Sequence, residues 1–587
     1  MRNNPEEEEE EFLLNHSQNS TKGGVKTIPF IIVNESCERV ASFGLQPNMV
    51  LYITKFYNMD AARASVLLNL WSALSNGLAI FGAFISDSYI GRFRAIAIGT
   101  ISSLIGMIVL WLTALFPQIR PLPCGQDQLD CNAATAAQLA VILCSFGLIS
   151  IGAGFVRPCS VAFGADQLEN KENPDNERVM DTYFNWFYAS VGISLSVAIT
   201  VIVYIQVQFG WQVGFGVPAL LMVLSVSVYL IGSPLYIKAK PKGSLFTGLF
   251  QVAVAAFRKR HINVQLNYSD DCYYKAPESK LLKPSIDFRC LNRACIIEDP
   301  HMELKPDGKA SDPWSLCFVE QVEIMKCFLT VLPMWSTCIM LLVSFNQPLS
   351  IYQLLTMDRH ITPQFEIPAG SFGMITVLSL TIWIAFYDRA LVPLLSRYTG
   401  LPTGISPFSR MGIGLFLGIV ATAFSAITET IRRNKAINAG FEDDPNAVLN
   451  MSSMWFVPQL ALYGVAEALN VVGQIEFIYS LFPKTMSSFA AALYTFGLAL
   501  ASLINSLLVS MVDSITSAGG KTSWLATNIN KGHLDYYCWL MTFLCVINFL
   551  YFLAVCRFTD QHHHDGRSSL FPEVEEEHSE NRCFHGA

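Results

Sequence analysis

Three ionisable residues interrupt an apolar stretch near the start of the chain. Glu35, Glu38 and Arg39 stand between the apolar runs 28–33 and 40–51. A charged side chain in the bilayer core costs about 2.5–3.5 kcal/mol on insertion scales, so such residues rarely serve packing alone. Spacings of three and four residues place all three on one face of a helix. A carboxylate beside a guanidinium changes its proton affinity as its surroundings change, which suits proton coupling. A purely structural salt bridge is the alternative.

Arg157 is a second candidate, at the end of another apolar segment. It follows Gly152, Ala153 and Gly154, small residues that allow two helices to approach closely. A cation at this depth needs an anionic partner, and the glutamates of the first segment are suitable ones. Because a guanidinium hardly titrates, we expect Arg157 to be a fixed counter-charge that attracts an anionic substrate or takes part in gating, rather than a proton carrier. The alternative is an Arg whose head group reaches the polar surface from a helix end.

Two glutamates occupy the segment 454–480. Glu467 and Glu476 are nine residues, or two and a half helical turns, apart, and therefore point to nearly opposite faces. We expect Glu476 to face Arg157 as part of an inner gate and Glu467 to reach the substrate. At least one of the two is expected to be structural.

The segment 320–345 contributes two more candidates for binding or gating. Lys326 comes three residues after Glu323 and six after Glu320, which favours local pairing, with a gating role as the alternative. Phe345, near the other end of the segment, favours a larger or more apolar ligand, or simply packs against its neighbours. No histidine falls inside any apolar segment, so intramembrane imidazole is not expected to bind the solute.

The elements that must position these residues are membrane-spanning helices. Of the 587 residues, 52% are hydrophobic and only 15% are charged, with a mean hydropathy of +0.38. Segments long enough to cross about 30 Å of hydrocarbon occur near 28–53, 62–86, 95–117, 135–157, 183–208, 213–237, 320–345, 369–390, 409–430, 454–480, 487–512 and 536–557. We therefore predict an all-α membrane protein with about twelve transmembrane helices.

The predicted helices form two halves of six, as in transporters built from two repeats. The halves are residues 28–237 and 319–560, joined by the loop 238–318 and flanked by tails 1–27 and 561–587. Lys and Arg gather in the middle loop, which places this loop and both tails in the cytoplasm. Within the loop, residues 245–261 are predicted to form an amphipathic helix on the inner membrane surface, and residues 263–313 an irregular linker.

Several functions are excluded or disfavoured. The formal charge of −8 comes largely from acidic tails and indicates no nucleic-acid partner. The Cys and His residues do not have the spacing of metal ligands, so we expect no bound metal and no cofactor. No nucleophile–base pair stands out either, so we do not expect the chain to be an enzyme. Cys124 and Cys131 share a predicted outer loop, where a disulfide is possible. The expected partners are a small solute, protons and the lipid bilayer.

One motif indicates a family. The stretch Gly82–Arg94, with Asp87, Gly91 and Arg92 between two apolar segments, resembles the signature of the major facilitator superfamily. Together with the Glu-x-x-Glu-Arg pattern, the chain resembles the proton-dependent oligopeptide transporter branch and, within it, the plant nitrate/peptide transporter family. Further similar stretches are 157–167, 184–188 and 473–477.

The resemblance implies a major facilitator fold and a proton-coupled symporter of a small anionic solute, nitrate first. Peptides, glucosinolates and carboxylated hormones such as gibberellin or abscisic acid are alternatives, as is a proton-independent uniporter or a nutrient receptor. It also implies that Glu35, Glu38 and Arg39 couple protons. The family commonly has Lys where this chain has Arg157. We expect the plasma membrane as the location, with the vacuolar membrane as the alternative.

Overall fold

The computed structural model describes residues 23–121, 133–168, 176–239, 245–262, 272–275, 283–306, 308–400, 404–481 and 487–564. Ten helices in these ranges are long and apolar enough to cross a membrane, and the bent pair that begins at Val319 adds an eleventh. The first long helix, of 29 residues, is less apolar because its interior contains Glu35, Glu38, Arg39 and other polar side chains. The predicted all-α membrane architecture is confirmed, with ten or eleven spans identified among the described residues by length and composition where about twelve were predicted.

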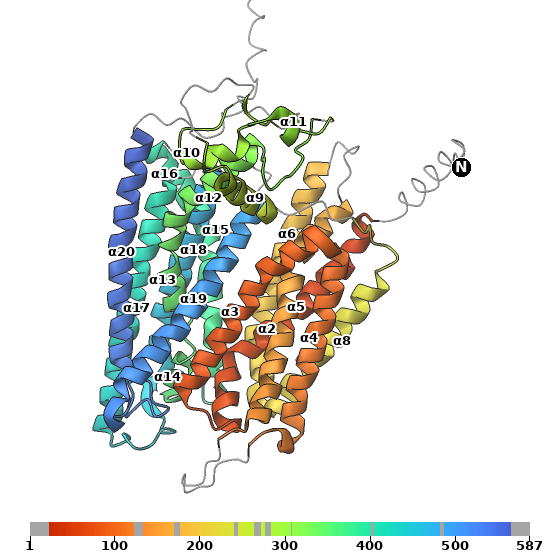
Figure 1. Cartoon of the computed structure of the whole chain (residues 1–587). Coiled ribbons are helices and arrows are strands. Elements are labelled where there is room, and N and C mark those ends of the chain that lie inside the picture. The colour runs from red at the N-terminus through yellow and green to blue at the C-terminus, as the bar shows by residue number, and fades with distance from the viewer. Residues whose placement is uncertain are drawn as a thin grey trace, which may run out of the picture. The chain divides into compact units, whose positions relative to one another are not determined.

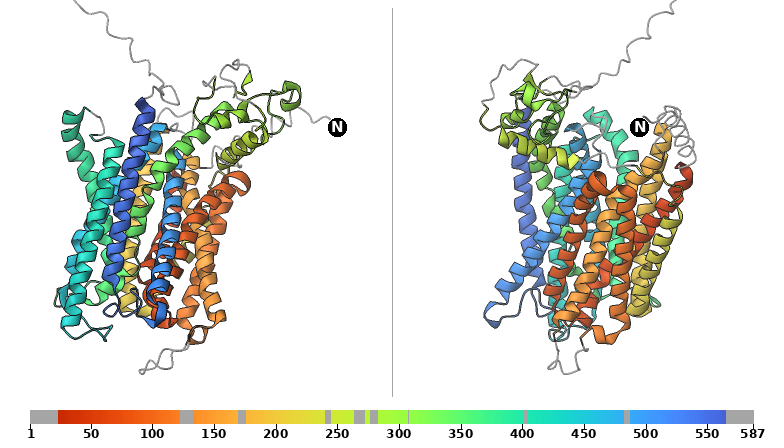
Figure 2. Two further views of the ribbon diagram at one scale, coloured as in Figure 1. Left: turned by 60° about the vertical axis from the view of Figure 1, so that its left-hand side comes forward. Right: turned by 45° about the vertical axis from the view of Figure 1, so that its right-hand side comes forward.

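The helices of the first half lie side by side with their axes nearly parallel (Figures 1 and 2). They are α2 (Ile28–Phe56), α3 (Ala61–Ile85), α4 (Arg92–Leu115), α5 (Ala136–Leu168), α6 (Asn176–Val197), α7 (Val203–Gln208) and α8 (Gly210–Ile231). Short π-helical segments, η2 (Ser86–Ile90) and η4 (Ala198–Ile202), follow α3 and α6. A residue with positive φ, Gly91 (φ 78°), makes the turn from η2 into α4, a conformation that glycine adopts without strain.

The helices of the second half are more often interrupted. They are α12 (Val319–Ser336), α13 (Ile339–Phe345), α14 (Ser350–Leu355), α15 (Gly373–Phe386), α16 (Val392–Thr399), α17 (Pro407–Asn438), α18 (Val457–Leu481), α19 (Ser487–Thr516) and α20 (Leu534–His564). Strands β1 (Met357–Asp358) and β4 (Leu449–Ser452) pair in parallel, and β2 (His360–Thr362) pairs antiparallel with β3 (Phe365–Glu366). The predicted span 320–345 is thus divided into two helices.

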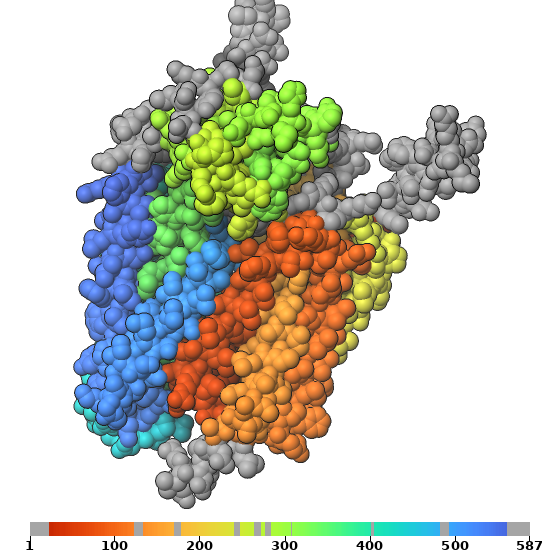
Figure 3. Space-filling model, viewed as in Figure 1, coloured from red at the N-terminus to blue at the C-terminus, as the bar shows by residue number. Residues whose placement is uncertain are grey.

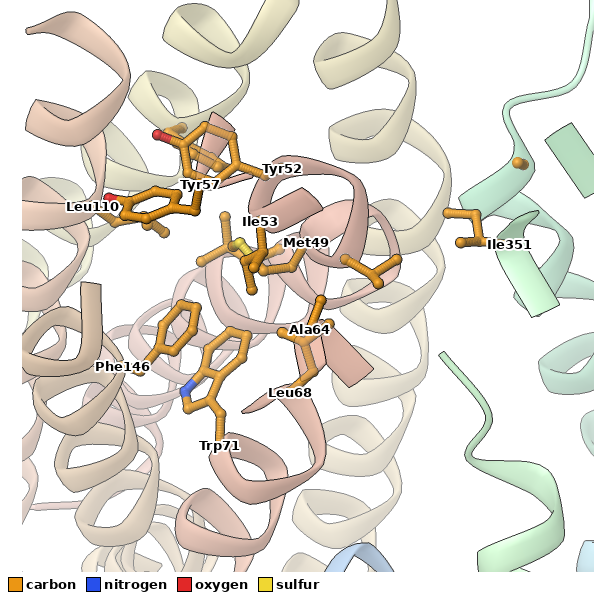
Figure 4. Close-up of a cluster of buried hydrophobic side chains, with 14 of the residues drawn as sticks. Met49, Tyr52, Ile53, Tyr57, Ala64, Leu68, Trp71, Leu110, Phe146 and Ile351 are labelled. Atoms are coloured by element: carbon orange, nitrogen blue, oxygen red, sulfur yellow. The ribbon is translucent and has the colours of Figure 1, made fainter. Parts of the chain in front are cut away.

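The chain forms two compact units whose boundaries differ from those of the predicted halves. The first, here called the bundle unit, comprises residues 1–243, 337–473 and 491–550. The second, the loop unit, comprises residues 244–336, 474–490 and 551–587. A large apolar core of the bundle unit, part of it shown in Figure 4, includes Tyr52, Trp71 and Phe146, with the rings of Trp71 and Phe146 stacked at 4.3 Å.

Within the bundle unit, the two halves are hydrogen-bonded at one end. Asn505 Nδ2 in α19 donates to Asn69 Oδ1 in α3 at 3.2 Å, and Ser502 donates to Ser72 at 3.2 Å. The surfaces of α3 and α19 accordingly lie along each other in Figure 3. Asn505 also donates to the Asn346 carbonyl and accepts from Tyr537. These α3 residues lie in the half of the helix that is farther from Gly91, between its middle and the predicted outer end.

The loop unit is more ordered than the sequence predicted. It contains α9 (Leu245–Arg258), α10 (Arg289–Asn292), η6 (Arg293–Cys295) and α11 (Pro300–Glu303). A small apolar core joins α9 and η6 to the first turns of α12 through Val252, Ala255, Cys295, Val319 and Val322. The opposite face of α9 exposes Phe250 and Phe257, by 65% and 66%. That α9 lies along the inner membrane surface stays a prediction.

Candidate functional site

The three ionisable residues of α2 form a buried cluster. Glu35 and Glu38 are fully buried. Arg39 Nε donates to Glu35 Oε1 at 2.7 Å, one helical turn away. The hydroxyl of Ser42 donates to Glu38 Oε1 at 2.6 Å, also one turn away. Each glutamate therefore has one oxygen that accepts a hydrogen bond, while Glu35 Oε2 and Glu38 Oε2 have none among the described residues.

Arg157 of α5 lies against this cluster. Its Nε is 3.7 Å from Glu38 Oε2, close enough for charge attraction but too far for a hydrogen bond. Its guanidinium carbon is 4.5 Å from the centroid of the Phe43 ring, which the Arg39 guanidinium approaches at 5.9 Å. Both cations thus contact one aromatic ring, an arrangement that contributes roughly 0.5–2 kcal/mol per contact. Sequence reasoning missed Ser42 and Phe43, since neither is ionisable.

Glycines allow α5 to pack closely against its neighbours. A Cβ atom at Gly152 would collide with Ser103 of α4, and one at Gly154 with Leu78 of α3. The same applies to Gly82 of α3, whose Cβ would overlap the Gly154 carbonyl. These contacts fix the height and rotation of α5, and with them the position of Arg157 three residues later.

The two glutamates of α18 have different surroundings. Tyr494 of α19 donates its hydroxyl hydrogen to Glu467 Oε1 at 3.0 Å. This contact, between residues 27 positions apart, had no signal in the sequence. Glu476 is half-buried and belongs to the loop unit. A contact between Glu476 and Arg157 would join the two units and stays a prediction.

A cavity of about 280 Å³ lies between the two halves of the bundle unit. It is lined from the first half by Gln46, Pro47, Leu68, Asn69, Trp71, Ser72 and Ile199, and from the second by residues of 345–376, Phe456 and Leu460. None of the lining residues is ionisable. The buried Asn69 Nδ2 has no hydrogen-bond partner among the described residues. Phe345 lines the cavity, is 39% exposed and meets Tyr463 edge-on.

The turn between α3 and α4 is held by ion pairs. Arg92 Nε donates to Asp87 Oδ1 at 3.1 Å, and Arg92 Nη1 lies 2.8 Å from both carboxylate oxygens of Asp166 in α5. The motif that indicated the family therefore joins the ends of three helices. Because Asp166 is 74 residues from Arg92, only the first of these pairs is local in the sequence.

Lys326 and the two cysteines of the predicted outer loop complete the set of predicted residues. Lys326 forms an ion pair of 2.7 Å with Glu323, and both side chains are buried. Cys124 and Cys131 lie outside the described residues, so their disulfide stays a prediction. Among the described residues, no group of three or more His, Cys, Asp or Glu side chains is placed to hold a metal ion.

A bundle of membrane-spanning helices with a cavity between its two halves is the architecture of a secondary transporter. The POT family model matches residues 93–525, and the chain belongs to this family. The proton-dependent branch indicated by the motifs is thereby confirmed.

Two relatives from Arabidopsis thaliana span nearly the whole chain. Protein NRT1/PTR FAMILY 1.2 is 47% identical over 562 residues, covering 94% of this chain and 92% of that protein. Protein NRT1/PTR FAMILY 1.1 is 45% identical over 588 residues, covering 98% and 99%. They confirm the similarity to the plant nitrate/peptide transporter family.

Solved structures share the fold. An auto-inhibited POT family peptide transporter has a TM-score of 0.63 at 19% identity, covering 91% of this chain and 97% of that one. The POT family transporter PepTSo has a TM-score of 0.61 at 16% identity, covering 90% and 99%. At these identities the likeness establishes the fold, which is the predicted one.

Proposed function

We propose that the chain is a proton-coupled symporter of a small anionic solute. The observation that carries this proposal is the charge balance of the buried cluster. Glu35 and Glu38 provide two negative charges, and Arg39 and Arg157 two positive ones, with Glu35–Arg39 at 2.7 Å and Glu38–Arg157 at 3.7 Å. Protonation of one glutamate would leave one guanidinium without its counter-charge. An anion can then supply the missing charge, so proton binding and anion binding favour each other.

Glu38 is the better candidate for the proton. Its contact with Arg157 is long and crosses from α2 to α5, whereas Glu35 and Arg39 share one helix. Relative movement of α2 and α5 would therefore change the attraction at Glu38 and leave that at Glu35 nearly unaltered. Since a neighbouring opposite charge favours the ionised carboxylate, such a movement can load or release a proton. Arg157 acts in this scheme as the fixed counter-charge.

Nitrate is the first solute to test. The cavity contains no ionisable residue, so nitrate that enters it would first accept hydrogen bonds from amides such as Asn69 Nδ2, which has no partner among the described residues, before it meets a guanidinium of the buried cluster. A carboxylated organic solute, such as gibberellin or abscisic acid, is the second candidate. It is favoured by the largely apolar lining and the exposed ring of Phe345, because pockets for organic ligands combine apolar walls with a few polar groups.

The test is uptake and current in a heterologous cell at pH 5.5 and pH 7.5. Nitrate, a dipeptide and a carboxylated hormone are supplied separately, and rates are normalised to the amount of protein at the cell surface. The proposal predicts accumulation against a gradient and a higher rate at pH 5.5 for at least one anion. Equal rates at the two pH values, or uptake that stops at equilibrium, would indicate a uniporter and overturn it. Binding without uptake would indicate a nutrient receptor.

A further inference from the structure

An ion pair in α12 is buried inside the loop unit. Glu323 Oε1 lies 2.7 Å from Lys326 Nζ, and each side chain is about 1% exposed. Removing two opposite charges from water costs more than their attraction returns unless further hydrogen bonds satisfy the remaining polar atoms. The partners that supply these bonds therefore determine whether this part of α12 is stable.

The partners of Glu323 Oε1 and of the Lys326 ammonium come from one residue of the middle loop, while Glu323 Oε2 accepts no hydrogen bond among the described residues. The backbone N–H of Ser285 donates to Glu323 Oε1 at 2.8 Å. Lys326 Nζ donates to the Ser285 carbonyl oxygen at 2.8 Å and to its hydroxyl oxygen at 3.0 Å. Ser285 thus contacts both charges with three of its polar atoms, although it precedes them by 38 and 41 residues. Asn292 Nδ2 in α10 donates to the same carbonyl at 3.0 Å.

The loop that holds Ser285 is itself folded against α12. Cys295 and Ala294 of η6 pack with Val319 and Val322 in the first turns of that helix. Lys259, at the end of α9, donates to the Ile296 carbonyl at 2.7 Å and pairs with Glu303 of α11 at 2.6 Å. Ser285 is therefore attached to a packed structure. The unit boundary agrees with this, because α12 falls in the loop unit while α13, the next helix in the chain, falls in the bundle unit.

We propose that Ser285 is a positioning residue for transport. Through Glu323 and Lys326 it holds α12 to the middle loop, so that the loop and this half of the seventh span move as one body. The break between α12 and α13 at residues 337–338 separates this body from the remainder of the span. The proposal rests on the proposed transport function for its effect on rate, but the contact itself can be measured without any substrate.

The test compares Ser285→Ala with the unmodified chain. This variant removes the hydroxyl oxygen that accepts from Lys326 and keeps both backbone bonds. Ser285→Thr restores a hydroxyl and serves as the rescue. Ser315→Ala is the matched control, because Ser315 makes a similar hydroxyl contact in the same unit, to the exposed ion pair of Arg258 and Asp312. Hydrogen exchange of residues 285–295 and solute uptake are measured on the full-length protein in membranes.

In Ser285→Ala we expect at least tenfold faster amide exchange in residues 285–295. We also expect a maximal uptake rate lower by about threefold or more, with the apparent KM within twofold. Ser285→Thr should recover both values, and Ser315→Ala should change neither.

Unchanged amide exchange in Ser285→Ala overturns the proposal, whatever the uptake rate of that variant. Faster exchange with an unchanged maximal rate shows a contact that only stabilises the loop and overturns the positioning role. If the unmodified chain transports none of the solutes, the proposed function fails, and exchange alone decides whether the contact exists.

Discussion

Arg157 Nε and Glu38 Oε2 face each other at 3.7 Å across α2 and α5, and neither atom has a hydrogen-bond partner among the described residues. The pair is buried, with Glu38 fully buried and the Arg157 side chain 12% exposed. A buried pair with this geometry has attraction but little directional restraint. It is therefore suited to forming and separating as the two helices shift.

Replacing Arg157 by Gln should abolish most of the transport. The change leaves Glu38 buried without its cation, a situation that costs about 3–5 kcal/mol in buried pairs. We expect at least a tenfold loss of uptake at pH 5.5 per molecule at the cell surface, with partial recovery in Arg157→Lys. Arg63→Gln is the control, because Arg63 forms a pair of the same 3.7 Å length with Asp60 in an exposed position. Equal losses in the two Gln variants would contradict the special role of the buried pair.

Glu38→Gln tests the proton itself. The amide imitates a permanently protonated carboxyl group, so we expect accumulation against a gradient to disappear and the dependence of uptake on pH to flatten. Exchange of labelled for unlabelled solute across the membrane should persist, because it needs no net proton movement. Glu35→Gln should retain more pH dependence, since Glu35 pairs within its own helix. A Glu38→Gln variant that still accumulates solute more strongly at pH 5.5 would assign the coupling to another residue.

Tyr494→Phe removes the hydroxyl that donates to Glu467. A hydrogen bond contributes about 0.5–1.5 kcal/mol, so if Glu467 binds the solute in the position that this bond fixes, we expect the apparent KM to rise about fivefold. The maximal rate should change less. Tyr183→Phe is the matched control, because the Tyr183 hydroxyl donates to a neutral acceptor, the Val161 carbonyl, and both of these residues lie in the first half. An unchanged KM in Tyr494→Phe would make the Glu467 contact structural.

His533, directly before α20, gives a prediction on stability and pH. Partial burial and the positive charge of Arg433 lower its pKa from the ordinary 6.5, and the nearby Asp535 only partly offsets them. A lowered pKa in the folded state means that protonation favours the unfolded state. The contribution of His533 is therefore complete above about pH 6.5 and is lost as the pH falls below that value.

The measurement is the Tm of the purified protein at pH 7.5 and at pH 5.5. The unmodified chain should lose more of its Tm on acidification than His533→Gln, which cannot take up this proton. Parallel losses in the two proteins would show that His533 has no part in the acid dependence.

Local patterns in the sequence predicted the helices well and their ends less well. The second predicted segment, 62–86, nearly coincides with Ala61–Ile85, whereas 409–430 became the 32 residues Pro407–Asn438. Hydropathy detects the part of a helix that is apolar, and α17 continues into polar residues such as Arg432 and Lys435. The division of the span 320–345 after Ser336 was not visible in the apolar pattern either.

The site was predictable where single residue types are costly in a membrane. Glu35, Glu38, Arg39 and Arg157 are ionisable and were identified for that reason, but their mutual distances depend on how α2 packs against α5. Phe43 and Ser285 were missed because their importance comes from partners up to 114 positions away in the chain, and nothing in their own neighbourhood marks them. Only the packed structure brings such residues together.

The junction between the halves at the predicted outer end is built from amides and hydroxyls. Asn505 bonds to Asn69 and Ser502 to Ser72, and none of these groups gains or loses a proton at physiological pH. The strength of this closure should therefore be the same in acidic and neutral surroundings and nearly indifferent to salt. Acidity would then act on the transport cycle through the ionisable groups and not through this closure, whose contribution to the free energy is the same at every pH.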